Sequence, residues 1–335
     1  MLFPLSYSIF FISLTLGTFL SISSSSWFGA WIGLELNLLS FIPLISLKKN
    51  FFLSEAALKY FLIQALASTI IIMSSCLIFF SPMIPSFLLL MSLFMKLGAA
   101  PFHFWFPQVM EGLSWLQAMI LMTIQKMAPM YLISYLMDKT LFLHFTAISA
   151  ILSSLVGALG GLNTMSLRKL MAFSSINHMS WMLIAISINE ILWILYFLFY
   201  SVISASVVMI FFFCQSYSIS DLLNSKFSGP LLSLSIPMSF LSLGGLPPFS
   251  GFIPKWVMIQ VLVMNNAEFI LFFLLFSSLL TLYFYLRLLM PFILLSTPIL
   301  SLNLKFNAGP FFFSVSMFSL FNILGLMLPL PFLMY

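Results

Sequence analysis

Five ionisable side chains lie deep inside long apolar stretches of the sequence, where a charge is costly. Glu35, Lys96 and Lys126 each stand well inside an apolar run, and His178 lies in the middle of another. Lys255 follows a Gly- and Pro-rich interruption of a further run. A charge at the centre of a membrane helix costs roughly 2.5–3.5 kcal/mol on insertion scales, and such residues are typical of ion pathways and proton relays. These five are therefore the candidate functional residues.

Lysine suits proton transfer inside a membrane because its charge responds strongly to its surroundings. Burial in a low dielectric lowers the pKa of an amine, and a nearby carboxylate raises it again. A carboxylate that moves, or a second cation that opposes it, would switch a buried lysine between a protonated and an empty state. One glutamate and three lysines within apolar runs therefore indicate a proton pathway.

Prolines accompany each of the three lysines and predict interruptions of their helices. A proline inside a membrane helix removes a backbone hydrogen bond, and the freed carbonyl can then accept from water or from a side chain. We therefore expect polar helix breaks beside the lysines, at Pro101 after Lys96, at Pro129 after Lys126, and at Pro247, Pro248 and Pro254 before Lys255.

Structural explanations compete with the functional one at several positions. A membrane lysine or arginine near a helix end often extends to the interface, and this interpretation suits Lys59 and Arg287. It fits the mid-run lysines poorly. Glu35 could be a structural partner of a neighbouring helix, and His178, beside Asn177, could be an interhelical hydrogen-bonding residue. Both alternatives remain open at the level of sequence.

The composition identifies lipid as the solvent of this chain. Of its 335 residues, 62% are hydrophobic and 6% are charged, whereas soluble domains carry about 25% charged residues. The net charge of +5 does not indicate a nucleic-acid partner, because the basic residues are scattered over many apolar runs. The sequence has no disulfide framework, phosphate-binding glycine loop, or set of zinc, iron–sulfur or haem ligands. We expect no nucleotide, flavin or metal cofactor in this chain.

The apolar runs predict an all-α membrane protein with about 11 transmembrane helices, since about 20 apolar residues cross the hydrocarbon core. The first run is expected to be a retained helix, because no basic region or cleavage pattern accompanies it. The ninth run must be broken by its central LGGLPPFSG, residues 243–251. We expect helices at 3–22, 25–46, 57–80, 84–107, 113–136, 140–161, 168–187, 190–215, 229–264, 268–290 and 311–331.

A short motif recurs in two of these runs and suggests an internal repeat. The stretches 97–101 (LGAAP) and 243–247 (LGGLP) share the pattern Leu-Gly-small-x-Pro and are five predicted helices apart. An odd number of helices between them would invert one unit relative to the other, as in transporters with discontinuous helices. We expect one antiporter-like transmembrane domain over the whole chain, with inverted five-helix repeats at about 1–137 and 138–290 and an added C-terminal helix at about 311–331.

The basic residues also predict the orientation of the chain. One predicted membrane face carries eight of them in loops or at helix ends, and the opposite face carries Lys139. The positive-inside rule places the basic face and the N-terminus in the matrix or cytoplasm, and the C-terminus on the opposite side. The eight residues are Lys48, Lys49, Lys59, Arg168, Lys169, Lys226, Arg287 and Lys305.

The stretches around the candidate residues resemble a known family, the mitochondrially encoded, antiporter-like membrane subunits of respiratory complex I (NADH dehydrogenase). They match in order along most of the chain and are specific in combination. The matching stretches are WFGAWIGLELN (27–37), EAALKYF (55–61), KLGAAPFHFW (96–105), QKMAP (125–129), SSINHMSW (174–181) and LGGLPPFSGFIPKW (243–256).

This resemblance implies a role for each matching position. Glu35 corresponds to the family's membrane glutamate and Lys96 to its paired lysine. Lys126 corresponds to the lysine of the central axis, and Lys255 to the lysine of the second broken helix. His178 falls where the family carries a polar residue between the two halves.

The resemblance also implies a setting. The chain would be a proton-translocating subunit in the mitochondrial inner membrane, with its N-terminus in the matrix and its C-terminus in the intermembrane space. Its partners would be other membrane subunits of complex I, including neighbouring antiporter-like subunits, and lipids such as cardiolipin, with no nucleic acid. The complex would carry NADH, FMN, iron–sulfur clusters and ubiquinone in other subunits.

Two other functions remain open from the residues alone. A free-standing cation/proton antiporter of the same ancestral fold would work without redox partners and respond to sodium or potassium. A purely structural spacer between pumping subunits would have no need of several ionisable groups at mid-membrane. Hydration around those groups distinguishes a pathway from a spacer.

Overall fold

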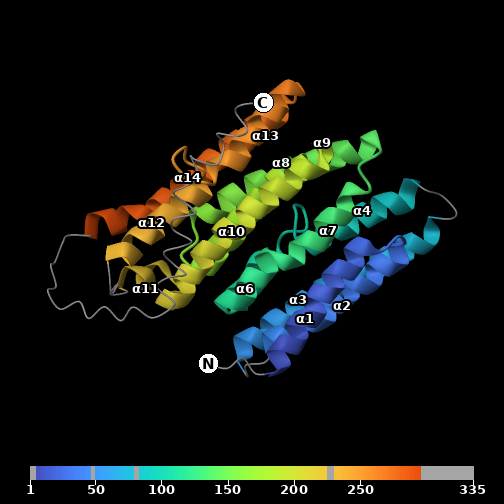
Figure 1. The fold of residues 1–335 in the computed structure, drawn as a ribbon, viewed down its shortest axis with the longest axis horizontal. Coiled ribbons are helices and arrows are strands. Elements are labelled where there is room, and N and C mark those ends of the chain that lie inside the picture. Colours follow the sequence, from blue (N-terminus) through green and yellow to red (C-terminus); the bar gives the residue numbers. More distant parts are fainter. Residues whose placement is uncertain (1–4, 47–49, 79–82, 225–229, 296–335) are drawn as a thin grey trace. The chain divides into compact units, whose positions relative to one another are not determined.

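The computed structural model describes residues 5–46, 50–78, 83–224 and 230–295, which fold into helices joined by turns (Figure 1). In this part of the chain there are fourteen helices and, in place of a sheet, one isolated bridge between Ser166 and Ser218. The prediction of an all-helical protein is confirmed. The helices are α1 Leu5–Ser23, α2 Trp27–Ser46, α3 Phe51–Leu77, α4 Met83–Leu97, α5 Trp105–Gly112, α6 Trp115–Met122, α7 Ile124–Ser134, α8 Thr140–Leu162, α9 Leu167–Ile188, α10 Glu190–Cys214, α11 Ile219–Asn224, α12 Pro230–Gly244, α13 Phe252–Met264 and α14 Glu268–Leu295.

Eight stretches among the described residues are long and apolar enough to cross a membrane: α1, α2, α3, α6 with α7, α8, α9, α10 and most of α14. Three shorter apolar helices, α4, the second half of α12 and α13, adjoin interruptions of the chain. The predicted helix at 311–331 lies outside the described residues, as do Lys48, Lys49, Lys226 and Lys305.

The chain forms two compact units. The first contains residues 1–153 with 186–190, and the second contains 154–185 with the described chain from 191 onward. In the first unit α1 packs on α2, α3 packs on α2, α4 and α5, and α7 packs on α4. In the second unit α12 and α13 pack on α14. In the apolar segment of α9, 83% of the residues are buried, against 22% in α1. His178 therefore belongs to an interior helix.

Helices α1 and α2 approach closely because glycines face one another across them. A Cβ atom added at Gly33 would stand 2.5 Å from the Ser21 nitrogen and 2.8 Å from the Gly17 carbonyl oxygen. A Cβ at Gly17 would stand 2.9 Å from the Asn37 nitrogen. Small residues permit such backbone contact in lipid, where packing rather than exclusion of water holds helices together. This contact fixes the helix that carries Glu35.

The second unit contains a similar contact between α8 and α9. A Cβ atom at Gly157 would stand 2.7 Å from the Asn177 nitrogen and 2.9 Å from the Phe173 carbonyl oxygen. Gly157 and Asn177 have the same spacing in sequence as Gly17 and Asn37. The same local packing therefore occurs once in each unit.

Two helices end in the same kind of turn. Gly98, after α4, has φ of 71°, and Gly245, after α12, has φ of 74°, a left-handed conformation that favours glycine. The N–H of each glycine and the N–H of the next residue donate to one carbonyl, that of Phe94 or of Leu241, at 3.0–3.3 Å. This hydrogen-bonded glycine cap ends a helix. The sequence motif aligned Gly98 with Gly244, whereas the backbone places Gly245 in the equivalent position.

The predicted breaks at Pro101, Pro247 and Pro248 are confirmed, because all three residues lie in turns between helices. The helix expected at 84–107 therefore ends at Leu97, before the first of these turns. The helix expected at 229–264 is divided into α12 and α13.

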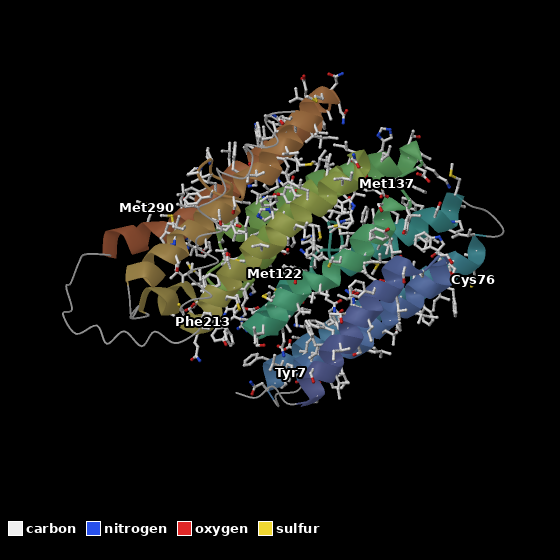
Figure 2. The ribbon with its side chains drawn as sticks, in the orientation of Figure 1. Tyr7, Cys76, Met122, Met137, Phe213 and Met290 are labelled. Atoms are coloured by element: carbon white, nitrogen blue, oxygen red, sulfur yellow. The ribbon has the colours of Figure 1, made fainter. Side chains whose placement is uncertain are left out.

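The predicted breaks at Pro129 and Pro254 are wrong. Pro254 lies in the first turn of α13, where the missing N–H has no helical partner to lose. Pro129 lies inside α7. The chain is interrupted upstream at Thr123, directly after Met122, which is labelled in Figure 2. The Thr123 hydroxyl donates to the Met119 carbonyl at 2.7 Å, a bond that competes with the helix and bends it.

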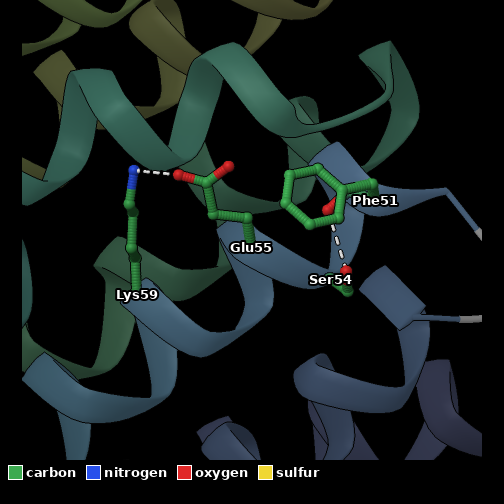
Figure 3. A network of polar contacts seen from close by, with 4 residues as sticks. All are labelled: Phe51, Ser54, Glu55 and Lys59. Atoms are coloured by element: carbon green, nitrogen blue, oxygen red, sulfur yellow. Dashed lines mark hydrogen bonds and ion pairs between the residues drawn. The ribbon is translucent and has the colours of Figure 1, made fainter.

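Helix α3 begins at Phe51 rather than near residue 57, and Lys59 therefore lies within it. Its Nζ atom is 2.7 Å from a carboxylate oxygen of Glu55, one turn earlier (Figure 3). Both side chains are more than 40% exposed, so the pair contributes only about 0.3–0.5 kcal/mol. Lys59 is a surface residue and a suitable control for the buried lysines.

The Gly33 contact yields a test of the α1–α2 packing. We expect Gly33→Ala to lower the stability of the folded protein by about 1–3 kcal/mol, because its Cβ meets rigid backbone atoms. The amount of assembled protein and its thermal midpoint in detergent are the measurements. Gly29→Ala in the same helix is the control, since its Cβ meets only the side chains of Ser24 and Ser26. Equal stability of both variants would contradict the packing argument.

Candidate functional site

The first unit contains a small cavity with two lysines in its wall. The volume in which the centre of a water molecule fits is about 20 Å³, and a cavity needs roughly 10–15 Å³ of such volume to hold one water. The space therefore suits a single water between polar groups. Its lining residues are Leu34, Asn37, Tyr60, Gln64, Lys96, Leu97, Trp105, Phe106, Leu121, Gln125, Lys126 and Pro129.

Lys96 is positioned by the end of α4. It lies in the last helical turn, two residues before Gly98, and only 7% of it is exposed. Side chains from two other helices bind the carbonyls of this turn. The Gln64 amide donates to the Lys96 carbonyl at 3.3 Å, and the Trp105 indole N–H donates to the Met95 carbonyl at 3.0 Å. Side chains of the protein thus bind two carbonyls at the broken end of this helix.

Lys126 is positioned by the interruption at Thr123. Its backbone N–H donates to the Thr123 carbonyl at 3.0 Å, and only 2% of the residue is exposed. The Nζ atom lies 4.9 Å from the centre of the Phe106 ring, within the range of a cation–π interaction. The face of an aromatic ring stabilises a cation without being able to take its proton.

Glu35 lies on α2, on the same helix as the cavity residue Asn37. Its carboxylate interacts electrostatically with the Lys96 ammonium and with the Tyr60 hydroxyl. Its Oε2 atom is buried and has no hydrogen-bond partner within the described structure. The structure therefore places Glu35, Lys96 and Lys126 in one unit, where the two lysines line the cavity and Glu35 lies outside its lining.

A chain of neutral side chains borders the same cavity. The Tyr60 hydroxyl donates to Gln125 Oε1 at 3.2 Å, and Gln125 Nε2 donates to Asn37 Oδ1 at 2.8 Å. These bonds join α3, α7 and α2 beside Lys126. No role was predicted for these three residues from the sequence. Their position as polar residues within apolar runs is the feature by which they could have been identified.

Lys255 and His178 belong to the second unit. Lys255 is 6% exposed, and its Nζ atom donates to the Gly244 carbonyl at 2.9 Å. His178 is 7% exposed, and its Nδ1 atom is 3.0 Å from the Tyr196 hydroxyl. The His178 ring also packs beside Tyr200, with ring centres 5.2 Å apart. The interhelical hydrogen bond expected as an alternative for His178 is present.

The described residues contain no group of three histidine, cysteine, aspartate or glutamate side chains arranged to hold a metal ion. Around the cavity, the available chemistry is that of ammonium, carboxylate, amide and phenol groups with room for a water. Such a set can hold a proton and pass it on through hydrogen bonds.

Comparisons with known proteins agree with this chemistry. Residues 24–83 and 80–281 match the family described as NADH:quinone oxidoreductase/Mrp antiporter, transmembrane. The chain is 49% identical to NADH-ubiquinone oxidoreductase chain 2 of Anopheles gambiae, with 97% of both chains covered. It is similar to a chain of respiratory complex I from Thermus thermophilus, with a TM-score of 0.85, 26% identity, and 98% of this chain and 80% of that chain covered. A chain of the Mrp complex from a Dietzia species has a TM-score of 0.76 at 19% identity, covers 84% of this chain and 59% of its own length, and shares the fold.

The polar chain beside the cavity gives a stability prediction. We expect Gln125→Leu to destabilise the protein by about 1–3 kcal/mol for each partner left unsatisfied, here Asn37 and Tyr60. Tyr60→Phe, which removes one of the two bonds, should cost less. The measurement is the thermal midpoint of the detergent-solubilised assembly, with Leu62→Ala on an exposed face as control. If Gln125→Leu costs no more than the control, the chain does not join the three helices.

Proposed function

Because the chain belongs to the NADH:quinone oxidoreductase/Mrp antiporter transmembrane family, we propose that it is a proton-translocating membrane subunit of a respiratory NADH:ubiquinone oxidoreductase. The observation that carries this proposal is the water-sized cavity with Lys96 and Lys126 in its wall and Glu35 beside it. Burying a cation in lipid costs free energy, so two lysines that share one polar cavity are more readily explained by a function in proton transfer than by packing.

The proposed transfer step runs between the two lysines. Two ammonium groups around one small cavity repel each other, so the arrangement favours one proton shared between Lys96 and Lys126. Glu35 holds the charge on Lys96, and Phe106 accommodates the charge on Lys126. A change in charge outside this unit, driven by electron transfer elsewhere in the complex, would then move the proton from one lysine to the other through a water.

Lys255 and His178 provide the second part of the proposed pathway. Both are buried in the second unit, and each has a polar contact to a neighbouring helical segment. Together with Glu35, Lys96 and Lys126, they form the set of residues assigned to proton transfer.

The proposed architecture is 11 membrane spans in one antiporter-like domain, with inverted repeats at about 1–137 and 138–290 and a C-terminal helix at about 311–331. The paired contacts at Gly17 and Gly157 and the equivalent turns at Gly98 and Gly245 support the repeat. The three apolar helices that are shorter than a full span support discontinuous helices within it.

The proposed setting rests on the similarity to a complex I subunit and, for the orientation, on the unequal distribution of basic residues between the two predicted faces. The chain would lie in the mitochondrial inner membrane with its N-terminus in the matrix and its C-terminus in the intermembrane space. Its partners would be other complex I membrane subunits, including neighbouring antiporter-like subunits, and lipids such as cardiolipin. NADH, FMN, iron–sulfur clusters and ubiquinone would be bound by other subunits, and this chain would have no redox site.

A free-standing cation/proton antiporter is the second candidate function. The family description and the fold shared with an Mrp complex chain favour it. The 49% identity to a complex I subunit ranks it below the redox-driven pump.

Neutral substitutions of the charged pair test the proposed function. We expect Lys96→Met and Glu35→Gln each to lower coupled NADH:ubiquinone turnover and proton pumping by roughly tenfold or more, because a proton-transfer group is lost. Both rates are measured in sealed membrane vesicles containing the intact complex. Lys59→Met is the matched control, since that lysine is exposed and paired with Glu55. Normal turnover and a normal proton-to-electron ratio in both charge variants would remove the assignment.

A cation-replacement experiment separates the two candidate functions. In the same vesicles, we expect the NADH-driven acidification of the vesicle interior to be unchanged when sodium and potassium are replaced by choline. Acidification that depends on an alkali cation, and persists when NADH oxidation is blocked, would favour the antiporter.

A further inference from the structure

We propose that the C-terminal end of α12 is the counter-charge of Lys255, and that Gly245 is the positioning residue that admits the lysine to it. This inference rests on the proposed proton-transfer function and assigns part of it to the helix break. Gly245 therefore acts through Lys255 and does not itself carry a proton.

The contact between the lysine and the helix end is direct. Lys255 Nζ donates to the Gly244 carbonyl at 2.9 Å, and Gly244 is the last residue of α12. The final carbonyls of a helix have no partner within the helix, and together they represent about half a negative charge. Lys255 thus satisfies one of these carbonyls and places its ammonium at the negative end of the helix dipole.

No carboxylate serves this purpose for Lys255 in the described chain. Among the described residues, no carboxylate lies within 4.0 Å of Lys255 Nζ, whereas the exposed Lys59 is paired with Glu55. The titratable side chain that faces this turn from α14 is Tyr285, whose ring carbon would be 3.7 Å from a Cβ at Gly244. From α10, the apolar Ile203 side chain faces the turn at Gly251. Lys96, in contrast, has Glu35 beside it.

Gly245 meets two requirements at once. Its φ of 74° favours glycine. A Cβ atom there would stand 2.8 Å from Lys255 Cδ, 3.0 Å from Nζ and 3.1 Å from Cε. Any larger residue would therefore displace the lysine side chain along most of its length, including the atom that contacts the carbonyl.

The arrangement couples the charge of Lys255 to the shape of a turn. If residues 245–251 open, the Gly244 carbonyl leaves the ammonium, and the lysine loses its stabilising partner without any carboxylate moving. Closing the turn restores the partner and favours protonation. A conformational change at the break can thereby control the protonation and deprotonation of Lys255.

The neighbouring glycine of the same turn supplies the control. Gly244 is the last residue of α12, and alanine there keeps the carbonyl that accepts from Lys255. A Cβ at Gly244 would meet Tyr285 Cδ2 at 3.7 Å and Leu282 Cγ at 3.9 Å, which are ordinary contacts, and no atom of Lys255 lies within 4 Å of it. The two variants differ in whether the new methyl group presses on a lysine.

The test compares Gly245→Ala and Gly244→Ala in the intact complex, reconstituted in sealed vesicles, by the pH profile of NADH-driven pumping. We expect the alkaline limb of the Gly245→Ala profile to move to lower pH by about one unit, since a charge-assisted hydrogen bond is lost. The Gly244→Ala profile should keep its alkaline limb, because the new methyl group does not touch Lys255. If both limbs stay, or both move equally, the proposal is overturned.

Two further variants keep the outcome interpretable. If Gly245→Ala does not assemble, Gly245→Asn is used, because asparagine tolerates positive φ yet fills the same space; the same shift is expected. Lys255→Met separates this inference from the proposed function. If Lys255→Met leaves pumping intact, the role of Lys255 in the pathway fails. If it stops pumping while Gly245→Ala leaves the profile unchanged, only the counter-charge proposal fails.

Discussion

Inside a bilayer, a backbone carbonyl that leaves a helix needs a donor from the protein or from a water held in a protein cavity, because lipid offers none. This requirement explains the surroundings of both broken helices. Glycine caps at Gly98 and Gly245 satisfy the carbonyls of Phe94 and Leu241 with backbone N–H groups. Side chains bind further carbonyls at both helix ends, those of Met95, Lys96 and Gly244, and thereby bring polar groups into the interior of each unit.

The two breaks differ in the kind of donor that they use. At the end of α4, the neutral side chains of Gln64 and Trp105 bind the last turn, and Lys96 is left to face the cavity. At the end of α12, the donor is the ammonium of Lys255. The same glycine-capped helix end is thus bound by neutral side chains in the first unit and by a titratable side chain in the second. Similar turns therefore need not have similar functions.

The sequence predicted the apolar helices, the interrupted ninth segment and the burial of Lys96, Lys126, Lys255 and His178, because charge and apolar length are local properties. It did not predict the interruption at Thr123. Proline is the stronger signal in a sequence, but the helix is interrupted at Thr123, whose φ of −113° and ψ of −82° leave the helical region. The polar chain through Tyr60, Gln125 and Asn37 joins three helices, and its pairing depends on how they pack. Residue types alone do not specify such a network.

The size of the cavity beside Lys96 and Lys126 also bears on which particle it can accept. A sodium or potassium ion would have to shed most of its hydration shell to enter a space for one water, and it would need several oxygen ligands in exchange. The walls offer two amines, which repel a metal cation when they are protonated. A proton has no shell to lose, because it moves by exchanging one O–H or N–H bond for another. If this cavity belongs to a proton pathway, as we propose, its small size would favour transfer of a proton between hydrogen-bonded groups over passage of a metal ion.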